Sequence, residues 1–471
     1  MMELKLAHLN QLWGEPICIE THSLDNLLGP ICTDSRNLKQ GNFFVPLKGD
    51  FFDGHDFLQK AFDLGAQAAV VSRSSEVPIP KGLLHWIVDD TLKAYQQLGL
   101  LHRSNLNIPV IAVTGSVGKS TTRELISASL APLGKIAATS NNNNNNIGVP
   151  LTLLAADSSH SAIVVEMGMR GLGEIERLSR FTKPDIAVIT NIGNAHIGLL
   201  GSRRNIAKAK CEVTSHLNPT GLVVIPSGDP LLEEELERVW KGSVFRVALQ
   251  SDYLANTSYD YDFSLCSPDI DLKARISVNK GELYLEDEIF KLPLEGTHNA
   301  RNFLLAIAVS RTLGVSNQDL KQLQVKLPLG RHDVIQIGGI TFIDETYNAS
   351  PESVKAALSL LASKPGRHFA VLGTMLELGD HSLTLHREIV EYAVDLGLDG
   401  LVIVTKGSEA VSMKEAASSL RYFAVVSNPE EAFHPLRSWL NSGDTVLLKA
   451  SRGVSLERLI PIFFDNQSIS N

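Results

Sequence analysis

Short apolar runs that are long enough for buried strands recur along the chain, and segments with helical periodicity follow them. The run Ile108–Val113 is one of these. After it, the apolar residues that fall on one arc of a helix are Leu125, Ile126, Leu130 and Leu133. A glycine-rich turn separates the two. The pattern therefore predicts a strand, a glycine turn and a helix, in this order.

Further apolar runs predict strands on both sides of this unit. An amphipathic helix that begins near Ala61 leads into the strand Ala68–Val71, and strands are also predicted at Ala162–Val165 and Asp185–Ile189. Residues 226–292 show short alternating strands with acidic turns and no chemical motif. From about residue 330 onward, the strand-like runs are Ile340–Ile343, Phe369–Leu372, Leu401–Val404, Phe423–Val426 and Val446–Leu448.

Strands that alternate with helices predict an α/β protein with mostly parallel sheets. At 471 residues the chain is too long for one hydrophobic core. We expect three domains: residues 1–104, residues 105–327 around the glycine turn, and residues 328–471. The last has a Rossmann-like layout, but no G-x-G-x-x-G sequence follows its first predicted strand, so we expect no dinucleotide site there.

Composition narrows the classes of protein. With 44% hydrophobic and 20% charged residues, the chain resembles an ordinary soluble globular protein. The net charge of −9 argues against nucleic acid as the main partner. The four cysteines form no C-x-x-C pair, which fits a reducing compartment and gives no zinc site. The N-terminus lacks a signal-peptide pattern and no apolar run approaches a membrane span, so we expect a cytoplasmic protein.

The glycine turn has the residues of a phosphate-binding loop. Thr114–Thr122 reads T-G-S-V-G-K-S-T-T. Glycines let backbone amides curl toward an anion at the helix N-terminus, while Lys119 supplies charge and Ser120 a hydroxyl for Mg²⁺. Val113 stands where the common pattern has glycine, and the alternative is an ordinary strand-to-helix turn. The residues predicted to contact nucleotide phosphates here are Thr114, Gly115, Ser116, Val117, Gly118, Lys119, Ser120 and Thr121.

An acid follows the next predicted strand. Ala162–Val165 ends at Glu166, and a carboxylate at the end of a strand beside a phosphate loop is well placed to hold a metal ion. A charge there is also what any strand leaving the core would show. The phosphate loop upstream favours the metal.

Thr114–Thr122 resembles the nucleotide loop of the Mur ligases, the ATP-dependent enzymes that build the cell-wall peptide. The resemblance covers nearly the whole chain and is greatest to the members that add D-alanyl-D-alanine. It implies an N-terminal α/β domain that binds the uridine nucleotide, a central P-loop ATPase domain and a C-terminal Rossmann-like domain that binds the incoming dipeptide. In the first domain, the D-S-R turn implies uridine nucleotide contacts at Asp34, Ser35 and Arg36.

An asparagine run follows the phosphate loop. Asn141–Asn146 is short and lies between apolar segments, so we expect an ordered polar loop and not a low-complexity tract. It resembles the family's T-x-x-N-x-N-N-x-I-G-x-P. The contacts to the substrate sugar and peptide that this implies are Thr139, Asn142, Asn144 and Asn145.

Two further motifs of the central segment resemble the family. Thr190–His196 is similar to N-x-G-x-A-H, which implies that His196 lies beside the metal site. Ile206–Glu212 is similar to A-x-A-K-x-E, whose lysine is typically carbamylated, and this implies a second Mg²⁺ ligand at Lys210. Carbamylation requires a deprotonated amine, which a partly buried lysine can supply. Without these motifs, a lone histidine would more often be structural and paired lysines would be solvated.

Motifs at the end of the central segment and the start of the last domain imply more contacts. G-x-H-N-x-x-N implies that Asn302 reaches the nucleotide, and a G-R pair implies that Arg331 reaches the ATP phosphates. A motif similar to D-[DE]-x-Y-N-A-N-P places Asp344 on the ribose and Tyr347 and Asn348 near the dipeptide.

The end of the last predicted strand resembles the family's K-G-S-R, which implies substrate contacts at Lys449, Ser451 and Arg452. Carboxyl ends of strands are where ligands of open parallel sheets bind. Three residues depart from the family pattern, namely Ser350, Thr374 and Ala450.

The resemblance implies an ATP-dependent ligase that joins D-alanyl-D-alanine to UDP-N-acetylmuramoyl-tripeptide through an acyl phosphate, in peptidoglycan precursor synthesis. Its cofactors would be ATP and Mg²⁺, its partners small molecules only, and we expect a monomer. The catalytic residues implied are Lys119, Glu166, His196, Lys210 and Arg331. The metal would be held by Ser120, Glu166, His196 and a carbamate on Lys210.

Three alternatives remain open. The diamino-acid-adding Mur ligases share the first two domains but carry a D-N-P-R motif, whereas the only similar text here is Ser427–Glu430 without the arginine. Folylpolyglutamate synthase lacks a unit like residues 1–104. A nucleotide-dependent switch without ligase chemistry would not need the asparagine run.

Overall fold

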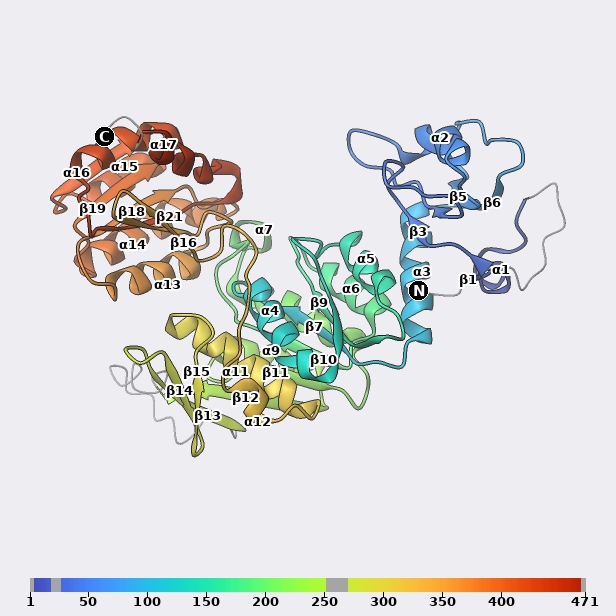
Figure 1. Cartoon of the computed structure of the whole chain (residues 1–471), viewed down its shortest axis with the longest axis horizontal. Coiled ribbons are helices and arrows are strands. Elements are labelled where there is room, and N and C mark those ends of the chain that lie inside the picture. Colours follow the sequence, from blue (N-terminus) through green and yellow to red (C-terminus); the bar gives the residue numbers. More distant parts are fainter. Residues whose placement is uncertain (1–3, 18–26, 251–269, 467–471) are drawn as a thin grey trace.

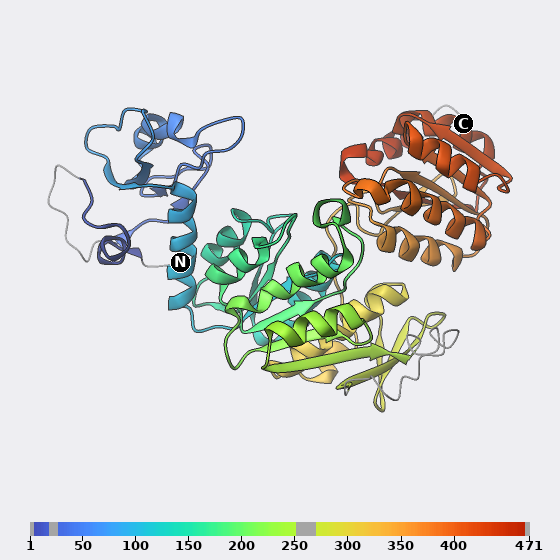
Figure 2. The ribbon, with the colours of Figure 1, turned by 180° about the vertical axis from the view of Figure 1, so that it is seen from behind.

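The computed structural model describes residues 4–17, 27–250 and 270–466. Three α/β domains lie in a row, with the N-terminal and C-terminal domains on opposite sides of the central one (Figures 1 and 2). Within this described part, no helix has the length and apolar character needed to cross a membrane. The predicted α/β class and mostly parallel sheets are confirmed.

The N-terminal domain is built on a small parallel sheet with the order β3-β4-β5-β6. Adjacent side chains of a strand point to opposite faces, so Phe43 joins one hydrophobic cluster and Phe44 the other. Phe43 packs edge-on against Trp86 with ring centroids 5.9 Å apart. The elements are β1 Leu4–Lys5, α1 Leu6–Trp13, β2 Leu27–Leu28, β3 Ile31–Cys32, β4 Phe43–Phe44, η1 Gly54–Phe57, α2 Leu58–Asp63, β5 Ala68–Ser72, β6 Leu84–Val88 and α3 Thr91–Asn105.

The central domain is built on one large sheet with the order β15-β14-β13-β12-β11-β10-β7-β9-β8, parallel from β8 to β13 and antiparallel at β14 and β15. Its first half comprises β7 Val110–Thr114, α4 Lys119–Leu130, η2 Ala131–Leu133, β8 Lys135–Ala138, α5 Gly148–Ala155, β9 His160–Glu166, α6 Glu174–Thr182, β10 Ile186–Ile189, α7 Ile197–Leu200, α8 Arg203–Cys211 and η3 Glu212–His216. Its second half comprises β11 Leu222–Pro226, α9 Pro230–Val239, β12 Ser243–Leu249, β13 Leu272–Ser277, β14 Glu282–Leu285, β15 Glu288–Lys291, α11 Thr297–Thr312 and α12 Asn317–Leu320.

Helices cover both faces of this sheet, which is why β7 is apolar and buried throughout. On one face α4 and α11 pack through residues such as Leu125, Ile126 and Phe303. On the other face α5, α6 and α8 pack through Leu153, Leu178 and other apolar residues. The helix that follows the glycine turn is thereby fixed against the centre of the sheet.

Two expectations for this domain are wrong. Leu133 does not lie on the arc of α4, because the helix ends at Leu130. Pro132, which has no backbone N–H to donate, follows in a 3-10 turn, and Leu133 is exposed. The stretch 226–292 contains the helix α9, which Asp229 caps by accepting hydrogen bonds from two backbone N–H groups. Residues 251–269 of that stretch lie outside the described residues.

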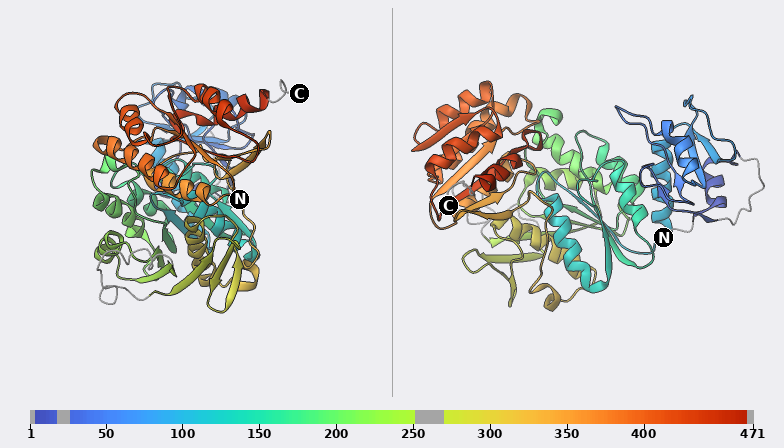
Figure 3. Two further views of the ribbon diagram at one scale, coloured as in Figure 1. Left: turned by 90° about the vertical axis from the view of Figure 1, so that its left-hand side faces the viewer. Right: turned by 45° about the horizontal axis from the view of Figure 1, so that its top comes forward.

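The C-terminal domain is a sheet with the order β16-β17-β21-β18-β19-β20, and helices lie on both of its faces (Figure 3). All five predicted strands are present and parallel. Its elements are β16 Asp333–Ile337, β17 Ile340–Asp344, α13 Pro351–Ala362, β18 His368–Gly373, η4 Gly379–His381, α14 Ser382–Asp395, β19 Gly400–Val404, α15 Ser408–Ala416, β20 Tyr422–Val426, η5 Pro429–Ala432, α16 Phe433–Trp439, β21 Thr445–Lys449, η6 Arg452–Val454, η7 Leu456–Arg458 and α17 Leu459–Asp465.

One strand of this domain was not predicted. β16 precedes β17 and pairs with it antiparallel. Gly338 and Gly339 join them with φ of 60° and 77°, which is the left-handed backbone that a tight hairpin turn requires. The first strand of the domain is therefore β16.

Candidate active site

Three neighbouring strands of the central sheet end at the same edge, and the segments at their ends form the site. β7 lies between β9 and β10, and the three are parallel. Their carboxyl ends carry the phosphate loop, Glu166 and the segment 190–196. A cavity of about 2070 Å³ opens there and extends to the C-terminal domain.

The phosphate loop has the backbone that its glycines predict. Gly115 and Gly118 have φ of 142° and 81°, in the region that favours glycine. A Cβ on Gly118 would lie 3.0 Å from Oδ1 of Asn302, so α11 lies directly against the loop. Lys119 Nζ donates to the carbonyls of Gly115 and Ser116 across 2.9 and 3.3 Å. Burial lowers the pKa of Lys119, because removing the ammonium from water disfavours the charged form.

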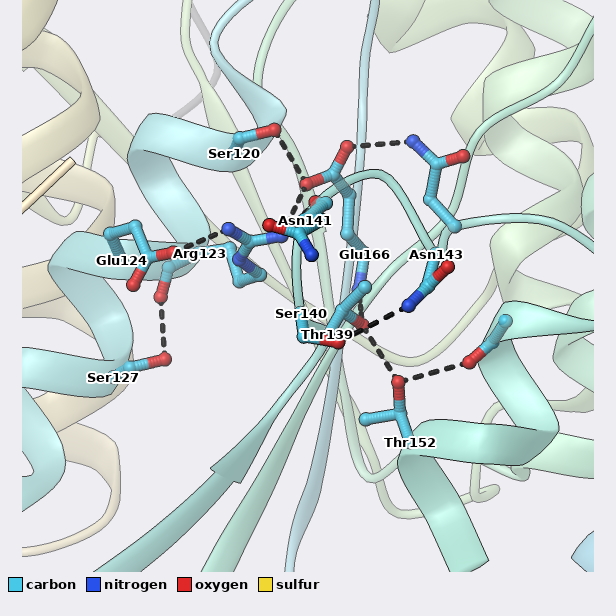
Figure 4. Close-up of polar contacts among 12 residues, drawn as sticks. Ser120, Arg123, Glu124, Ser127, Thr139, Ser140, Asn141, Asn143, Thr152 and Glu166 are labelled. Atoms are coloured by element: carbon cyan, nitrogen blue, oxygen red, sulfur yellow. Dashed lines mark hydrogen bonds and ion pairs between the residues drawn. The ribbon is translucent and has the colours of Figure 1, made fainter. Parts of the chain in front are cut away.

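Glu166 is the centre of a buried polar network. Its Oε2 accepts hydrogen bonds from Ser120 Oγ at 2.7 Å and from Arg123 Nη1 at 3.1 Å, as Figure 4 shows. Its Oε1 accepts from Asn144 Nδ2 at 2.8 Å. Arg123 is 0% exposed and also pairs with Glu124. The network joins the first turns of α4, the end of β9 and the asparagine loop.

The residues present are compatible with Mg²⁺. Ser120 and Glu166 supply one hydroxyl and one carboxylate in contact, and this small donor set is what Mg²⁺ uses when phosphate oxygens and water complete its shell. In the part of the chain that the structure describes, no group of three or more His, Cys, Asp or Glu side chains is arranged to hold a metal ion.

The asparagine segment forms an ordered loop. Asn145 Oδ1 accepts hydrogen bonds from the N–H groups of Ile147 and Gly148 and so caps the start of α5. Thr139 Oγ1 accepts from the N–H of Glu166 at 3.0 Å (Figure 4). Asn142, Asn144 and Asn145 line the cavity, whereas Thr139 lies behind it.

The segment after β10 contacts the phosphate loop. Asn191 accepts a hydrogen bond from the N–H of Val117 and donates one to its carbonyl, at 3.0 and 2.9 Å. His196 follows with a left-handed φ of 66°, and its Nδ1 is bonded to the carboxylate of Glu377 from the C-terminal domain. Burial lowers the pKa of His196, and the nearby charges of Lys119 and Lys210 lower it further.

Lys210 is enclosed in the central domain. The side chain is 0% exposed, and Nζ has no hydrogen-bond partner among the described residues. Burial, with a smaller contribution from Lys119, holds its pKa well below the usual value for lysine. Two positions earlier on α8, Lys208 is exposed. Lys210 is not among the residues that line the cavity.

The C-terminal domain contributes the opposite wall. The guanidinium of Arg331 lies 3.9 Å from the ring centroid of Tyr347. Lys449 Nζ bonds Glu345 at 3.0 Å and the carbonyl of Asn348 at 3.2 Å. The cavity-lining residues of this domain that the sequence singled out are Arg331, Tyr347, Asn348, Lys449, Ser451 and Arg452.

Several predicted residues lie apart from this cavity. Asp34, Ser35 and Arg36 belong to the N-terminal domain, on the far side of the central domain from the C-terminal one (Figure 1). Asp344 turns its carboxylate to the N–H and hydroxyl of Thr346 and does not line the cavity, whereas its neighbour Glu345 does.

The sequence reasoning gave no role to three residues of the site, although one of them, Asn191, is the asparagine of the N-x-G-x-A-H motif. Arg123 follows Ser120 by three positions, and this helical spacing was the signal that it shares the face of Ser120. Asn191 and Glu377 act through partners far away in sequence, and no local pattern identifies those partners.

Comparisons with known proteins bear on all three domains. Family models described as Mur ligase family, catalytic domain, as Mur ligase middle domain, and as Mur ligase, glutamate ligase domain match residues 30–114, 113–310 and 330–452. A UDP-N-acetylmuramoyl-tripeptide--D-alanyl-D-alanine ligase from Synechocystis sp. is 39% identical over 93% of this chain and 92% of its own length.

Solved structures are similar over the same length. MurF from Acinetobacter baumannii superposes with a TM-score of 0.81 at 31% identity and covers 94% of this chain and 95% of that one. MurF ligase from Thermotoga maritima in complex with ADP has a TM-score of 0.76 at 29% identity, covering 92% of this chain and 96% of that one.

Proposed function

Because the chain belongs to the Mur ligase family, we propose that it is the ATP-dependent ligase that joins D-alanyl-D-alanine to UDP-N-acetylmuramoyl-tripeptide in peptidoglycan precursor synthesis. One observation carries the proposal: a single cavity connects the phosphate loop with the strand ends of the C-terminal domain. Relatives with this activity in their names match nearly the whole chain, and a similar structure holds ADP.

The reaction needs activation of an acid. A carboxylate is a poor electrophile, so the γ-phosphoryl group of ATP is first transferred to the terminal carboxylate of the tripeptide. The amine of the dipeptide then attacks the acyl phosphate, the amide forms and phosphate leaves, together with ADP as the other product. The protein must clamp phosphates, hold acid and amine together and exclude water.

The phosphate loop and Arg331 would perform the clamping. Those amides of the loop Thr114–Thr121 that lie at the start of α4 would bind the phosphates, and Lys119 would exchange its two carbonyl partners for phosphate oxygens. Arg331 lines the cavity from the other domain and would meet charge that develops on the transferred group. Asn302 touches the loop and would contact the nucleotide. For Asp344 to contact the ribose, its carboxylate would have to leave Thr346 and turn toward the cavity.

Mg²⁺ would bind Ser120 and Glu166 and neutralise phosphate charge there. We further propose that Lys210 carries a carbamate. Its amine is buried, has no partner among the described residues and is deprotonated more readily than an exposed lysine, as attack on CO₂ requires. The carbamate oxygens would supply a second metal ligand, with His196 close by.

The substrate would span all three domains. The proposed division is residues 1–104 for the uridine nucleotide, with Asp34, Ser35 and Arg36, residues 105–327 for ATP, and residues 328–471 for the dipeptide. The sugar and peptide would contact Thr139, Asn142, Asn144 and Asn145. The dipeptide would contact Tyr347, Asn348, Lys449, Ser451 and Arg452. We propose a monomer that acts in the cytoplasm, where ATP and nucleotide-linked sugars are made.

A product assay by mass spectrometry tests the proposal. ATP, the UDP-tripeptide and one acceptor at a time are supplied, and the acceptors are D-alanyl-D-alanine, D-alanine and a diamino acid. We expect product only with the dipeptide. A separate reaction supplies a diamino acid with the UDP-muramoyl-dipeptide in place of the UDP-tripeptide. Product in that reaction would instead indicate the diamino-acid-adding ligase. Slow phosphate release regardless of acceptor would indicate a nucleotide switch. The Lys119→Ala variant, which lacks the phosphate-binding lysine, serves as the inactive control.

A further inference from the structure

The segment that carries His196 is held by the C-terminal domain. It begins after β10 in the central domain and continues into α7, which projects toward the C-terminal domain (Figure 1). His196 Nδ1 bonds the carboxylate of Glu377, which follows β18, and Arg170 lies 3.5 Å from the same carboxylate. Both His196 and Glu377 have left-handed φ, 66° and 64°, which non-glycine residues adopt only when their surroundings enforce it.

The two backbones also touch. The N–H of Gly198 donates to the carbonyl of Glu377 at 3.1 Å. A Cβ on Gly198 would lie 2.4 Å from the backbone nitrogen of Gly379, and a Cβ on Gly379 would lie 2.8 Å from the Cα of Gly198. Only glycine at both positions permits this approach without displacement of one backbone. The contact therefore depends on the exact docking of the two domains.

A second carboxylate of the C-terminal domain holds the start of the same segment. Glu352 on α13 accepts a hydrogen bond from the N–H of Asn194 at 2.7 Å, and a Cβ on Gly193 would lie 2.6 Å from its carboxyl carbon. On the other side, the N–H of Gly193 donates to Ser116 Oγ in the phosphate loop at 2.9 Å. The segment 193–198 thus connects the phosphate loop to the C-terminal domain.

We propose that Glu377 is a positioning residue that fixes His196 only when the C-terminal domain is docked. Phosphoryl transfer then occurs only after docking of the domain that brings the dipeptide. This rests on the function proposed above. An acyl phosphate formed in an open site would be lost to water, and ATP would be spent without product. A histidine whose placement requires docking prevents that loss.

The test compares Glu377→Ala, Glu377→Gln and Gly379→Ala with Glu388→Gln as control. Glu388 lies in the same domain, is 45% exposed and pairs with Lys355. We expect kcat to fall about 10–100-fold in Glu377→Ala, because His196 loses its fixed position. The KM for ATP and for the UDP-substrate should not change, because substrate binding is not affected. The kcat of Glu377→Gln should lie between those of the wild type and Glu377→Ala, since the amide oxygen of glutamine can still accept a hydrogen bond from His196. Gly379→Ala should lower kcat while the carboxylate is intact.

Additivity separates positioning from general damage. In a His196→Ala background, Glu377→Ala should cause no further loss of kcat, because the residue acts through His196. A further loss as large as in the wild-type background, or a wild-type kcat in Glu377→Ala, overturns the proposal. Thermal unfolding of each variant shows that it is folded.

A second measurement does not depend on the identity of the acceptor. Small-angle scattering with a non-hydrolysable ATP analogue should show a more compact wild-type protein than Glu377→Ala or Gly379→Ala. If the wild type and both variants were equally compact, the proposal that this contact determines domain docking would be overturned. If wild-type protein makes no product from D-alanyl-D-alanine but the compactness differs, the proposed function fails while the contact stands.

Discussion

Ser120 donates its hydroxyl proton to Oε2 of Glu166 across 2.7 Å, and this bond joins the first turn of α4 to the end of β9. Both groups are buried, at 3% and 2% exposure. They are neighbours because β7 and β9 are adjacent parallel strands, so the loop after one and the last residue of the other meet at one edge of the sheet. Arg123 and Asn144 bond the same carboxylate and hold it in place.

The pair predicts a specific dependence on magnesium. Glu166→Gln keeps the shape and one oxygen but removes the charge, so we expect the Mg²⁺ concentration for half-maximal activity to rise and kcat to fall by about 10²-fold. Phosphate release measured across a magnesium titration checks both. Ser127→Ala serves as control, because Ser127 donates to the carbonyl of Arg123 within the same helix. Equal magnesium curves for Glu166→Gln and wild type would contradict the metal role.

Lys210 predicts a dependence on bicarbonate. If the buried amine is carbamylated, activity should fall in buffer stripped of CO₂ and return when bicarbonate is added. Lys210→Ala should be inactive with or without it. Lys208→Ala, which changes an exposed lysine of the same helix, should behave as wild type. The measurement is the rate of phosphate release at fixed ATP. If Lys210→Ala stayed active and bicarbonate did not change its rate, carbamylation of Lys210 would be contradicted.

The position of Arg331 beside Tyr347 predicts that arginine supports a higher kcat there than lysine. The guanidinium of Arg331 lies over Tyr347 at 3.9 Å from the ring centroid, and a planar guanidinium makes such a contact better than a compact, strongly hydrated ammonium. We expect Arg331→Ala to lower kcat by about 10³-fold and Arg331→Lys by about tenfold, with smaller changes in KM for ATP. The matched control is Arg437→Lys, whose arginine lies 5.6 Å from the ring of Phe433 away from the cavity. A fully active Arg331→Lys would show that charge alone suffices.

The sequence predicts the parts of this site that are local. Lys119, Ser120 and Glu166 follow from a strand, a glycine loop and an acid at the end of the next strand, because sheet topology brings such ends together. The five C-terminal strands follow from apolar runs for the same reason. The hairpin strand β16 does not, since Asp333 and Gln336 leave it no continuous apolar run.

What the sequence could not predict depends on contacts between distant segments. His196 and Glu377 are 181 positions apart, and neither the chain pattern nor the motifs place one against the other. Lys208 and Lys210 are alike in sequence, and only the packing of α8 buries one and exposes the other. The orientation of Asp344 toward Thr346, with Glu345 facing the cavity, likewise depends on which face of β17 covers the site.

His386 predicts a dependence of stability on pH. The side chain is 0% exposed on α14, Nε2 accepts a hydrogen bond from the N–H of Met375 at 2.8 Å, and Nδ1 faces the carbonyl of Ser382 at 2.8 Å. This arrangement requires a neutral ring, and burial lowers the pKa accordingly. The unfolded chain, with a histidine pKa of about 6.5, therefore binds the proton more readily than the native state.

It follows that the stability associated with a neutral His386 is fully present above about pH 6.5 and decreases as the pH falls toward the native pKa. We expect the free energy of unfolding of the wild type to fall more steeply between pH 7.5 and about pH 5 than that of His386→Gln, which cannot titrate. Urea unfolding at a series of pH values measures both slopes. His381→Gln, which changes an exposed histidine five positions earlier, should keep the wild-type slope. If His386→Gln also kept it, protonation of His386 would not control stability in this range.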